Sequence, residues 1–318
     1  EKSERKKETK VKTFTVPLGL ENSKENIIIN TKTDSKTSQE KIINQAFKLH
    51  SQGKISEAAK YYQYFIDQGF KDHRVLSNYG TILKDIGKLK EAELLTRKAI
   101  NLNPNFADAH SNLGAILKDT GKLKEAEIAL RKAIKIKPDY LIAHCNLGNI
   151  LKDLGKLEEA ELLTRKAINL NPNFANAHFN LGNILKDLGK LKEAELYTRK
   201  AISINPNYAE AYANLGSTFS AQGKLEEAEL SLRKAIELKS DFAEAHSNLG
   251  SILIDLGKLK EAEIATRKAI ELNPGFANAY NNLGNILNNI GKSKEAEIST
   301  RKAIELNPDF ANAYSNLF

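Results

Sequence analysis

The nine residues GNILKDLGK fill Gly148–Lys156 and recur unchanged at Gly182–Lys190, 34 residues further along the chain. The same step governs most of the glycines and prolines. Fifteen of the 18 glycines form two series with this spacing, which begin at Gly53 and Gly80, and six of the seven prolines follow it too. A fixed period over most of a chain is the signature of a solenoid, in which each unit packs only on its neighbours.

Each unit carries the pattern of two helices. With Ala107 as position 1 of a unit, the next unit has apolar residues at positions 3, 7, 10, 11 and 14, which follow one face of a helix. Gly155 at position 15 interrupts this helix and suits a left-handed helix end. A second set at positions 17, 20, 24, 27 and 28 predicts a second helix that ends before Pro172. We therefore expect an all-α chain built of helical hairpins.

The junction between units predicts a helix cap. An asparagine or aspartate follows the proline in most units, as Asn105 and Asn173 do, and such side chains accept hydrogen bonds from the first N–H groups of a helix. Asp241 with Glu244 three residues later has the spacing of a capping box. We expect these residues to begin the first helix of each following unit.

This pattern resembles the tetratricopeptide repeat, which has a period of 34, small residues at positions 8, 20 and 27, large ones at 4, 7 and 11, and proline at 32. One stretch here, from position 3 to position 32, reads AHCNLGNILKDLGKLEEAELLTRKAINLNP. The resemblance implies a right-handed superhelical solenoid of helix-turn-helix repeats. This chain departs from the family at position 4, where it has His or Tyr, and at position 24, where it mostly has Thr. Both departures concern packing.

The resemblance also divides the chain. Residues 1–38 lack the period and are predicted to be a flexible polar leader, and residues 39–318 form the solenoid. Within the solenoid, 39–72 is a divergent repeat, 73–310 holds seven regular repeats and 311–318 is a truncated one. The repeat 209–242 is the least regular, since it lacks the proline. It is our candidate for a bend or a side-chain pocket.

Position 6 is asparagine in every regular repeat, and it shares a stripe of the first helix with positions 2, 9 and 13. In the family this stripe faces a concave groove. An amide offers a donor and an acceptor together, so it can match a peptide backbone unit. The predicted peptide-binding residues are Asn78, Asn112, Asn146, Asn180, Asn214, Asn248, Asn282 and Asn316.

The asparagine stripe is similar to that of the tetratricopeptide domain of protein O-GlcNAc transferases. That resemblance implies a ladder of amides that grips the backbone of a bound protein. The alternative is that each asparagine only bonds the neighbouring helix. Both hypotheses stay open at the level of the sequence.

The other candidate residues have structural explanations. Four histidines at position 4 share their slot with tyrosines elsewhere, so the slot takes a ring and we predict neither a metal site nor a cofactor. Cys145 is the single cysteine, so no internal disulfide can form, and it stands where other repeats have serine. The Glu93–Arg97 spacing recurs in each regular repeat and predicts surface ion pairs of about 0.2–0.5 kcal/mol each. No catalytic residue is predicted.

Composition excludes several classes of protein. Hydrophobic residues make up 41% and charged residues 28%, which is not the composition of a disordered chain. The net charge of +8 comes from interleaved signs, which indicates a solvated surface and no nucleic-acid partner. No apolar run approaches the ~18 residues of a membrane span, so no membrane association is predicted. A cytoplasmic location is the default expectation.

We therefore expect a non-enzymatic scaffold that binds extended peptide segments of partner proteins in its groove. The alternative from the enzyme class is the substrate-targeting region of a larger, glycosyltransferase-like protein whose catalytic domain lies beyond residue 318. RNA binding is a third reading that the mixed charge disfavours. The chain has no methionine and is expected to be a piece of something longer. Its truncated last repeat predicts end-to-end self-association.

Overall fold

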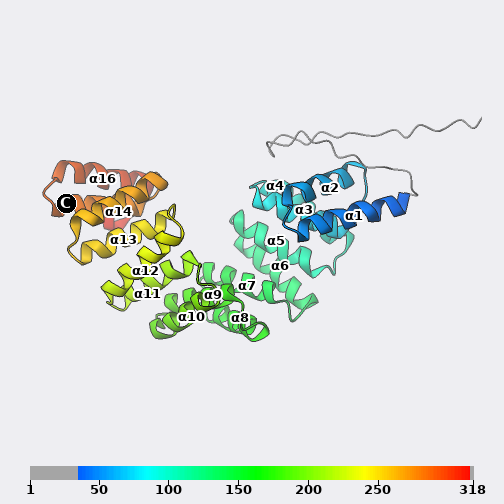
Figure 1. The fold of residues 1–318 in the computed structure, drawn as a ribbon, viewed down its shortest axis with the longest axis horizontal. Helices are drawn as coiled ribbons and strands as arrows, with labels where there is room; N and C mark the ends of the chain where they lie inside the picture. Colours follow the sequence, from blue (N-terminus) through cyan, green and yellow to red (C-terminus); the bar gives the residue numbers. More distant parts are fainter. Residues whose placement is uncertain (1–34, 316–318) are drawn as a thin grey trace, which may run out of the picture. The chain divides into compact units, whose positions relative to one another are not determined.

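The computed structural model describes residues 35–315, and helices are the regular elements in this part of the chain (Figure 1). In chain order they are α1 (Ser35–Ser51), α2 (Ile55–Asp67), α3 (His73–Asp85), α4 (Leu89–Leu102), α5 (Ala107–Asp119), α6 (Leu123–Ile136), α7 (Leu141–Asp153), α8 (Leu157–Leu170), α9 (Ala175–Asp187), α10 (Leu191–Ile204), α11 (Ala209–Ala221), α12 (Leu225–Leu238), α13 (Ala243–Asp255), α14 (Leu259–Leu272), α15 (Ala277–Asn289), α16 (Ser293–Leu306) and α17 (Ala311–Ser315). Most of the predicted leader, 1–38, lies outside the described residues, and α1 begins at Ser35. The chain divides into two compact units, Glu1–Ile150 and Leu151–Phe318.

Within each unit the helices pack as hairpins, as the 34-residue period predicts. In the first unit α1 pairs with α2, α3 with α4 and α5 with α6; in the second, α9 pairs with α10, α11 with α12, α13 with α14 and α15 with α16. First helices also pack on one another, as α3 does on α5 and α13 on α15. The fold is therefore an all-α stack of paired helices, which confirms the predicted class.

The predicted apolar sets form the core. Leu147, Ile150 and Leu151 of the first helix are at most 1% exposed, and Ala160 and Ala167 of the second are fully buried. No helix in the described part, residues 35–315, has the length and apolarity that a membrane crossing needs.

Glycine ends the first helix of each hairpin, as predicted. Gly87 has a φ of 79°, and its N–H bonds the carbonyl of Lys84 at 2.9 Å. The N–H of Lys88 then reaches back to the carbonyl of Leu83 at 2.8 Å. These two bonds satisfy carbonyls at the end of α3, and side chains with a Cβ rarely adopt this backbone conformation.

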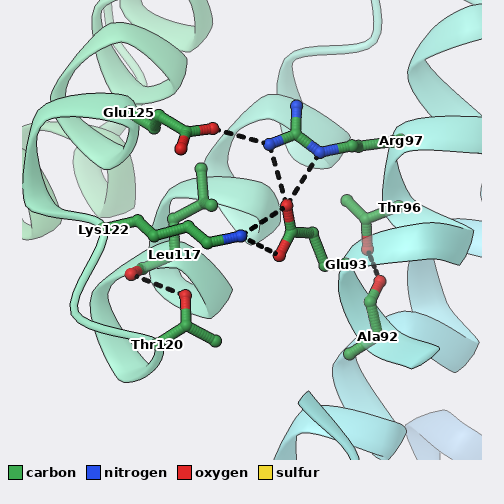
Figure 2. Close-up of polar contacts among 8 residues, drawn as sticks. All are labelled: Ala92, Glu93, Thr96, Arg97, Leu117, Thr120, Lys122 and Glu125. Atoms are coloured by element: carbon green, nitrogen blue, oxygen red, sulfur yellow. Dashed lines mark hydrogen bonds and ion pairs between the residues drawn. The ribbon is translucent and has the colours of Figure 1, made fainter. Parts of the chain in front are cut away.

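A second glycine explains the threonine at position 24. Gly80 faces Thr96 so closely that a Cβ on the glycine would clash with the threonine Oγ1. Thr96 is fully buried, and its hydroxyl donates to the carbonyl of Ala92 at 2.8 Å (Figure 2). The two helices of a hairpin approach closely at this point, and a large ring at position 24 would hold them apart.

The predicted helix caps are wrong. The first helices α5, α9 and α13 begin after Phe106, Phe174 and Phe242, and none of these N-cap positions has a side-chain cap bond. Asn105 and Asp241 stand one residue too early to cap. The asparagine before the proline makes the local bond instead, since Asn103 Oδ1 accepts from the N–H of Asn105 at 3.1 Å.

Candidate functional site

The position-6 asparagines lie on the first helices, where the period places them. Asn180 and Asn214 are 8% and 6% exposed, and the other described members of the set are half-buried. Asn316 lies outside the described residues, as do Leu317 and Phe318, on which the self-association hypothesis depends.

Four of these asparagines bond the preceding repeat. The donor–acceptor pairs are Asn78 Nδ2 to Tyr62 Oη at 3.5 Å, Asn112 Nδ2 to Ser77 Oγ at 3.0 Å, Asn214 Nδ2 to Thr198 Oγ1 at 3.1 Å, and Asn282 Nδ2 to the carbonyl of Ser247 at 3.3 Å. Each bond stays within one unit and joins successive hairpins. At these four positions the amide contributes to repeat packing, although each still carries a second N–H.

The side chains of Asn146, Asn180 and Asn248 make no hydrogen bond within residues 35–315. In two repeats the preceding position 5, which supplies the partner of Asn112 and Asn282, is already engaged. Ser111 before Asn146 bonds the Tyr140 hydroxyl. The carbonyl of Ala213 before Asn248 accepts from the Ser217 hydroxyl at 3.2 Å. These three amides therefore retain their full hydrogen-bonding capacity.

Two of the unpaired amides line small pockets. Asn248 borders a pocket of about 130 Å³ with Ser217, Ser220 and Ser251, and no charged residue lines it. It lies partly in the irregular repeat 209–242, where a side-chain pocket was predicted.

The equivalent pocket beside Asn146 has about 80 Å³ and is bordered by Lys84, Lys118 and Asp119. The position-6 stripe thus borders a charged pocket on the first helices of the first unit, and a neutral pocket on those of the second unit.

The charges at positions 12 and 13 pair along the first helices. Lys84 Nζ lies 2.9 Å from Asp85 and 3.7 Å from Asp119 of the next repeat, and its hydrogen bond with Asp85 raises its pKa above the ordinary value. Lys152 repeats the arrangement with Asp153 at 3.2 Å and Asp187 at 3.8 Å. Most of the corresponding positions in α11, α13 and α15 are uncharged.

The position-4 side chains contact a backbone carbonyl in the turn that precedes their repeat. His144 Nε2 lies 2.8 Å from the carbonyl of Pro138, and His110 and His178 make the same contact with proline carbonyls at 3.0 and 2.8 Å. His246 Nε2 lies 3.0 Å from the carbonyl of Ser240, which stands in the place of the proline. Tyr314 donates to the carbonyl of Pro308 at 3.1 Å. Each histidine therefore has a structural partner at its Nε2 atom.

Cys145 is 4% exposed, and burial raises the pKa of its thiol to about 12. A thiol that stays protonated at neutral pH is a poor nucleophile. Its surroundings are those of a packed core residue.

Successive second helices are joined by a network of side-chain ion pairs that was not predicted from the sequence. Glu93 accepts from Arg97 Nε at 2.9 Å within α4, and from Lys122 Nζ at 3.0 Å in the next repeat (Figure 2). Arg97 Nη2 extends to Glu125 of α6 at 2.8 Å. The predicted pair is thus the centre of a four-residue cluster. Lysine at position 16 and glutamate at position 19 recur in every regular repeat, and this recurrence is the feature of the sequence that could have predicted the network.

Comparison with known sequence families gives a consistent result. Models described as TPR repeat or tetratricopeptide repeat match residues 73–106, 95–128, 116–155, 148–189, 175–208, 197–229, 216–257, 243–276 and 265–298. No curated protein matches the chain significantly in sequence.

Among solved structures, a chain of the APC/C Cut9–Hcn1 hetero-tetramer matches with a TM-score of 0.72 at 15% identity. The match covers 87% of this chain and 54% of the other, so this chain spans about half the length of that relative. A tetratricopeptide repeat protein from Parabacteroides merdae has a TM-score of 0.61 at 20% identity, over 77% of this chain and 97% of its own. YrrB, described as a TPR protein with an unusual peptide-binding site, has a TM-score of 0.45 at 28% identity, over 59% and 96%.

Proposed function

Since the chain belongs to the tetratricopeptide repeat family, we propose that it is a protein-interaction scaffold whose first helices bind an extended peptide segment of a partner protein. The observation that carries this proposal is the set of three unpaired amides, Asn146, Asn180 and Asn248, on otherwise well-bonded helices. Half-buried amides without partners lose hydrogen-bond energy unless a ligand or water supplies it.

A peptide backbone has the matching chemistry. Each amide can donate to a peptide carbonyl and accept from a peptide N–H. Tightly packed helices lie about 10 Å apart, and an extended chain advances about 3.3 Å per residue. One asparagine can therefore meet about every third ligand residue. A backbone-gripping ladder of this kind is what the resemblance to the repeats of protein O-GlcNAc transferases implies.

The asparagines of the proposed ladder differ in how many hydrogen-bonding groups each can offer a ligand. Asn112 and Asn282 already donate to the preceding repeat, so they offer a ligand one N–H and the carbonyl oxygen. Asn146 and Asn248 offer the whole amide, and each stands beside a pocket. These pockets supply room for a peptide side chain next to the backbone contact.

The experiment is an unbiased peptide-array screen, followed by calorimetry on a peptide that binds. Replacing both Asn180 and Asn248 by Ala should weaken binding by about 1–3 kcal/mol, since each lost bond costs about 0.5–1.5 kcal/mol. Helix content and melting temperature should stay unchanged, because neither amide has a partner within the described residues.

Asn282→Ala is the matched control, since it removes a packing bond at the same repeat position. It should lower stability and reduce affinity less than either unpaired amide does. Equal affinity of the wild type and the Asn180, Asn248 double variant would refute the proposed contact.

A further inference from the structure

Position 22 of the second helix carries an exposed aliphatic residue in all seven regular repeats. The exposed fractions are Leu94 55%, Ile128 69%, Leu162 68%, Leu196 53%, Leu230 69%, Ile264 72% and Ile298 69%. Single exposed aliphatic residues are ordinary, but an exposed aliphatic residue at the same position of every regular repeat indicates a binding surface. The row lies on the second helices, so the proposed peptide contact on the first helices does not account for it.

In the first unit this row borders a large apolar pocket. The pocket has about 510 Å³ and lies between α4 and α6, with residues of α5 at its base. Leu113 and Leu117 form the base and are 5% and 1% exposed, and Ile100 and Ile128 stand on the two walls. A leucine or phenylalanine side chain from outside would meet aliphatic side chains at the base and on both walls, with the polar residues Arg97, Asn101, His110, Glu125 and Lys132 completing the lining.

The pocket is open because Ala129 occupies position 23. In the repeat 175–208 that position holds Tyr197, whose ring stacks on His178 at a centroid distance of 5.9 Å. Its hydroxyl also accepts from Arg165 Nη1 at 2.8 Å. Leucine stands at position 23 in two other repeats, as Leu95 and Leu163. A larger residue at this position therefore fills the space that Ala129 leaves.

The charge that remains free around this pocket is positive. Arg97 and Glu125 at its rim pair with each other at 2.8 Å. The side chains of five exposed lysines on α4 and α6 make no ion pair with any described residue: Lys90, Lys98, Lys124, Lys132 and Lys135. Lys132 lines the pocket itself, and Lys124 stands one helical turn before Ile128.

A second pocket with equivalent lining positions differs from this one in the charges around it. It lies among α12, α13 and α14, has about 540 Å³, and is lined by Ile264 and Ala265 at the positions of Ile128 and Ala129. Here Glu237 replaces Asn101 at the rim. Glu271 replaces Lys135 and pairs with Lys268 at 2.6 Å. The apolar lining is thus duplicated, while Lys234 and Lys268 are paired with Glu237 and Glu271, and Lys260 is the counterpart that stays without an ion pair among the described residues.

We propose that the pocket between α4 and α6 is a second docking site, which binds an acidic segment of a partner protein by one inserted leucine or phenylalanine side chain. The apolar base takes the inserted side chain, and the unpaired lysines of α4 and α6 attract the flanking aspartates and glutamates. The twin pocket among α12, α13 and α14 has no such preference for acidic flanks.

The test uses fluorescence anisotropy with a labelled synthetic peptide that carries one leucine between runs of Asp and Glu. Ala129→Leu fills the pocket with leucine, which two other repeats carry at position 23 (Leu95 and Leu163), so the fold is retained. It should weaken binding about 10- to 100-fold, which is the loss expected when one large aliphatic side chain is no longer buried. Ala265→Leu in the twin pocket is the matched control and should leave the affinity unchanged.

A charge variant provides an independent readout. The double variant Asn101→Glu, Lys135→Glu gives these two positions the residues of the twin pocket. It should lower the affinity for the acidic peptide and make that affinity less dependent on salt concentration. A peptide with Lys in place of Asp and Glu should bind the wild type poorly. The proposal is wrong if the wild type does not bind the acidic peptide, or if Ala129→Leu, folded by circular dichroism, binds it as well as the wild type does. Neither result bears on the asparagine contact.

Discussion

Replacing Glu93 by Gln should destabilise the first unit more than the loss of a surface ion pair does. The carboxylate bonds Arg97 of its own helix and Lys122 of the next repeat, and its side chain is only 16% exposed (Figure 2). Lys122 also occupies the N-cap of α6, where the helix dipole disfavours a cation, and the Glu93 carboxylate offsets that charge.

The magnitude follows from burial. An exposed ion pair contributes about 0–1 kcal/mol, and a hydrogen bond to a charged group about 1.5–3 kcal/mol. Glu93 makes two charged contacts at partial burial, and Gln retains one acceptor oxygen. We therefore expect a loss of about 1–2 kcal/mol in the free energy of unfolding.

The chain contains its own control. Glu297 pairs with Arg301 at 2.6 Å in the last regular repeat, where both side chains are more than half exposed and neither has an ion pair with any other residue of 35–315. Glu297→Gln should cost less than about 0.5 kcal/mol. Urea denaturation of both variants, fitted as a chain of nearest-neighbour repeats, measures the difference. Equal losses would show that the bridge to Lys122 adds nothing to stability.

Three other predictions concern Glu93, Gly114 and Cys145. The hydrogen bond with Lys122 holds the pKa of the Glu93 carboxyl below its ordinary value; desolvation opposes this shift and the bond with Arg97 adds to it. The stabilisation by Glu93 is therefore complete above the ordinary carboxyl pKa and is lost as pH falls through the lower folded-state pKa, so Glu93→Gln should flatten acid denaturation. Gly114→Ala should cost about 1–3 kcal/mol, because its Cβ would meet Leu130, and the double variant with Leu130→Ala should relieve the clash, both read by thermal melts. A thiol reagent should modify Cys145 only at the rate of local opening, as thiol titration with and without urea will report.

The hairpins and the core were predictable because they depend on spacing within one repeat. Apolar residues at helical spacing define a buried face wherever the chain runs, and Gly87 and its counterparts mark the helix end by a backbone conformation that suits glycine. The caps were not predictable from residue type alone, because a cap depends on which residue leaves the helical backbone. That residue is Phe106 in the repeat 107–140, so Asn105 is one position too early.

The site was predictable only in part, because its members differ in what the preceding repeat offers them. The period places every position-6 asparagine on one helix stripe. It does not reveal that the Ser217 hydroxyl already bonds the carbonyl of Ala213 before Asn248, or that the Tyr140 hydroxyl bonds Ser111 before Asn146. The bridges from Glu93 to Lys122 likewise join residues 29 apart and need the stacking of repeats to be seen.

The most direct test of the backbone contact is an N-methyl scan of a peptide that the chain binds. Methylating one backbone nitrogen at a time removes a single N–H and leaves every side chain in place. The account predicts losses of about 2- to 12-fold at roughly every third residue, which is the range for one hydrogen bond. It also predicts that the losses at two of these residues vanish in the variant that carries Asn180→Ala and Asn248→Ala. A peptide whose affinity depends on its side chains alone, with no sensitivity to backbone methylation, would contradict it.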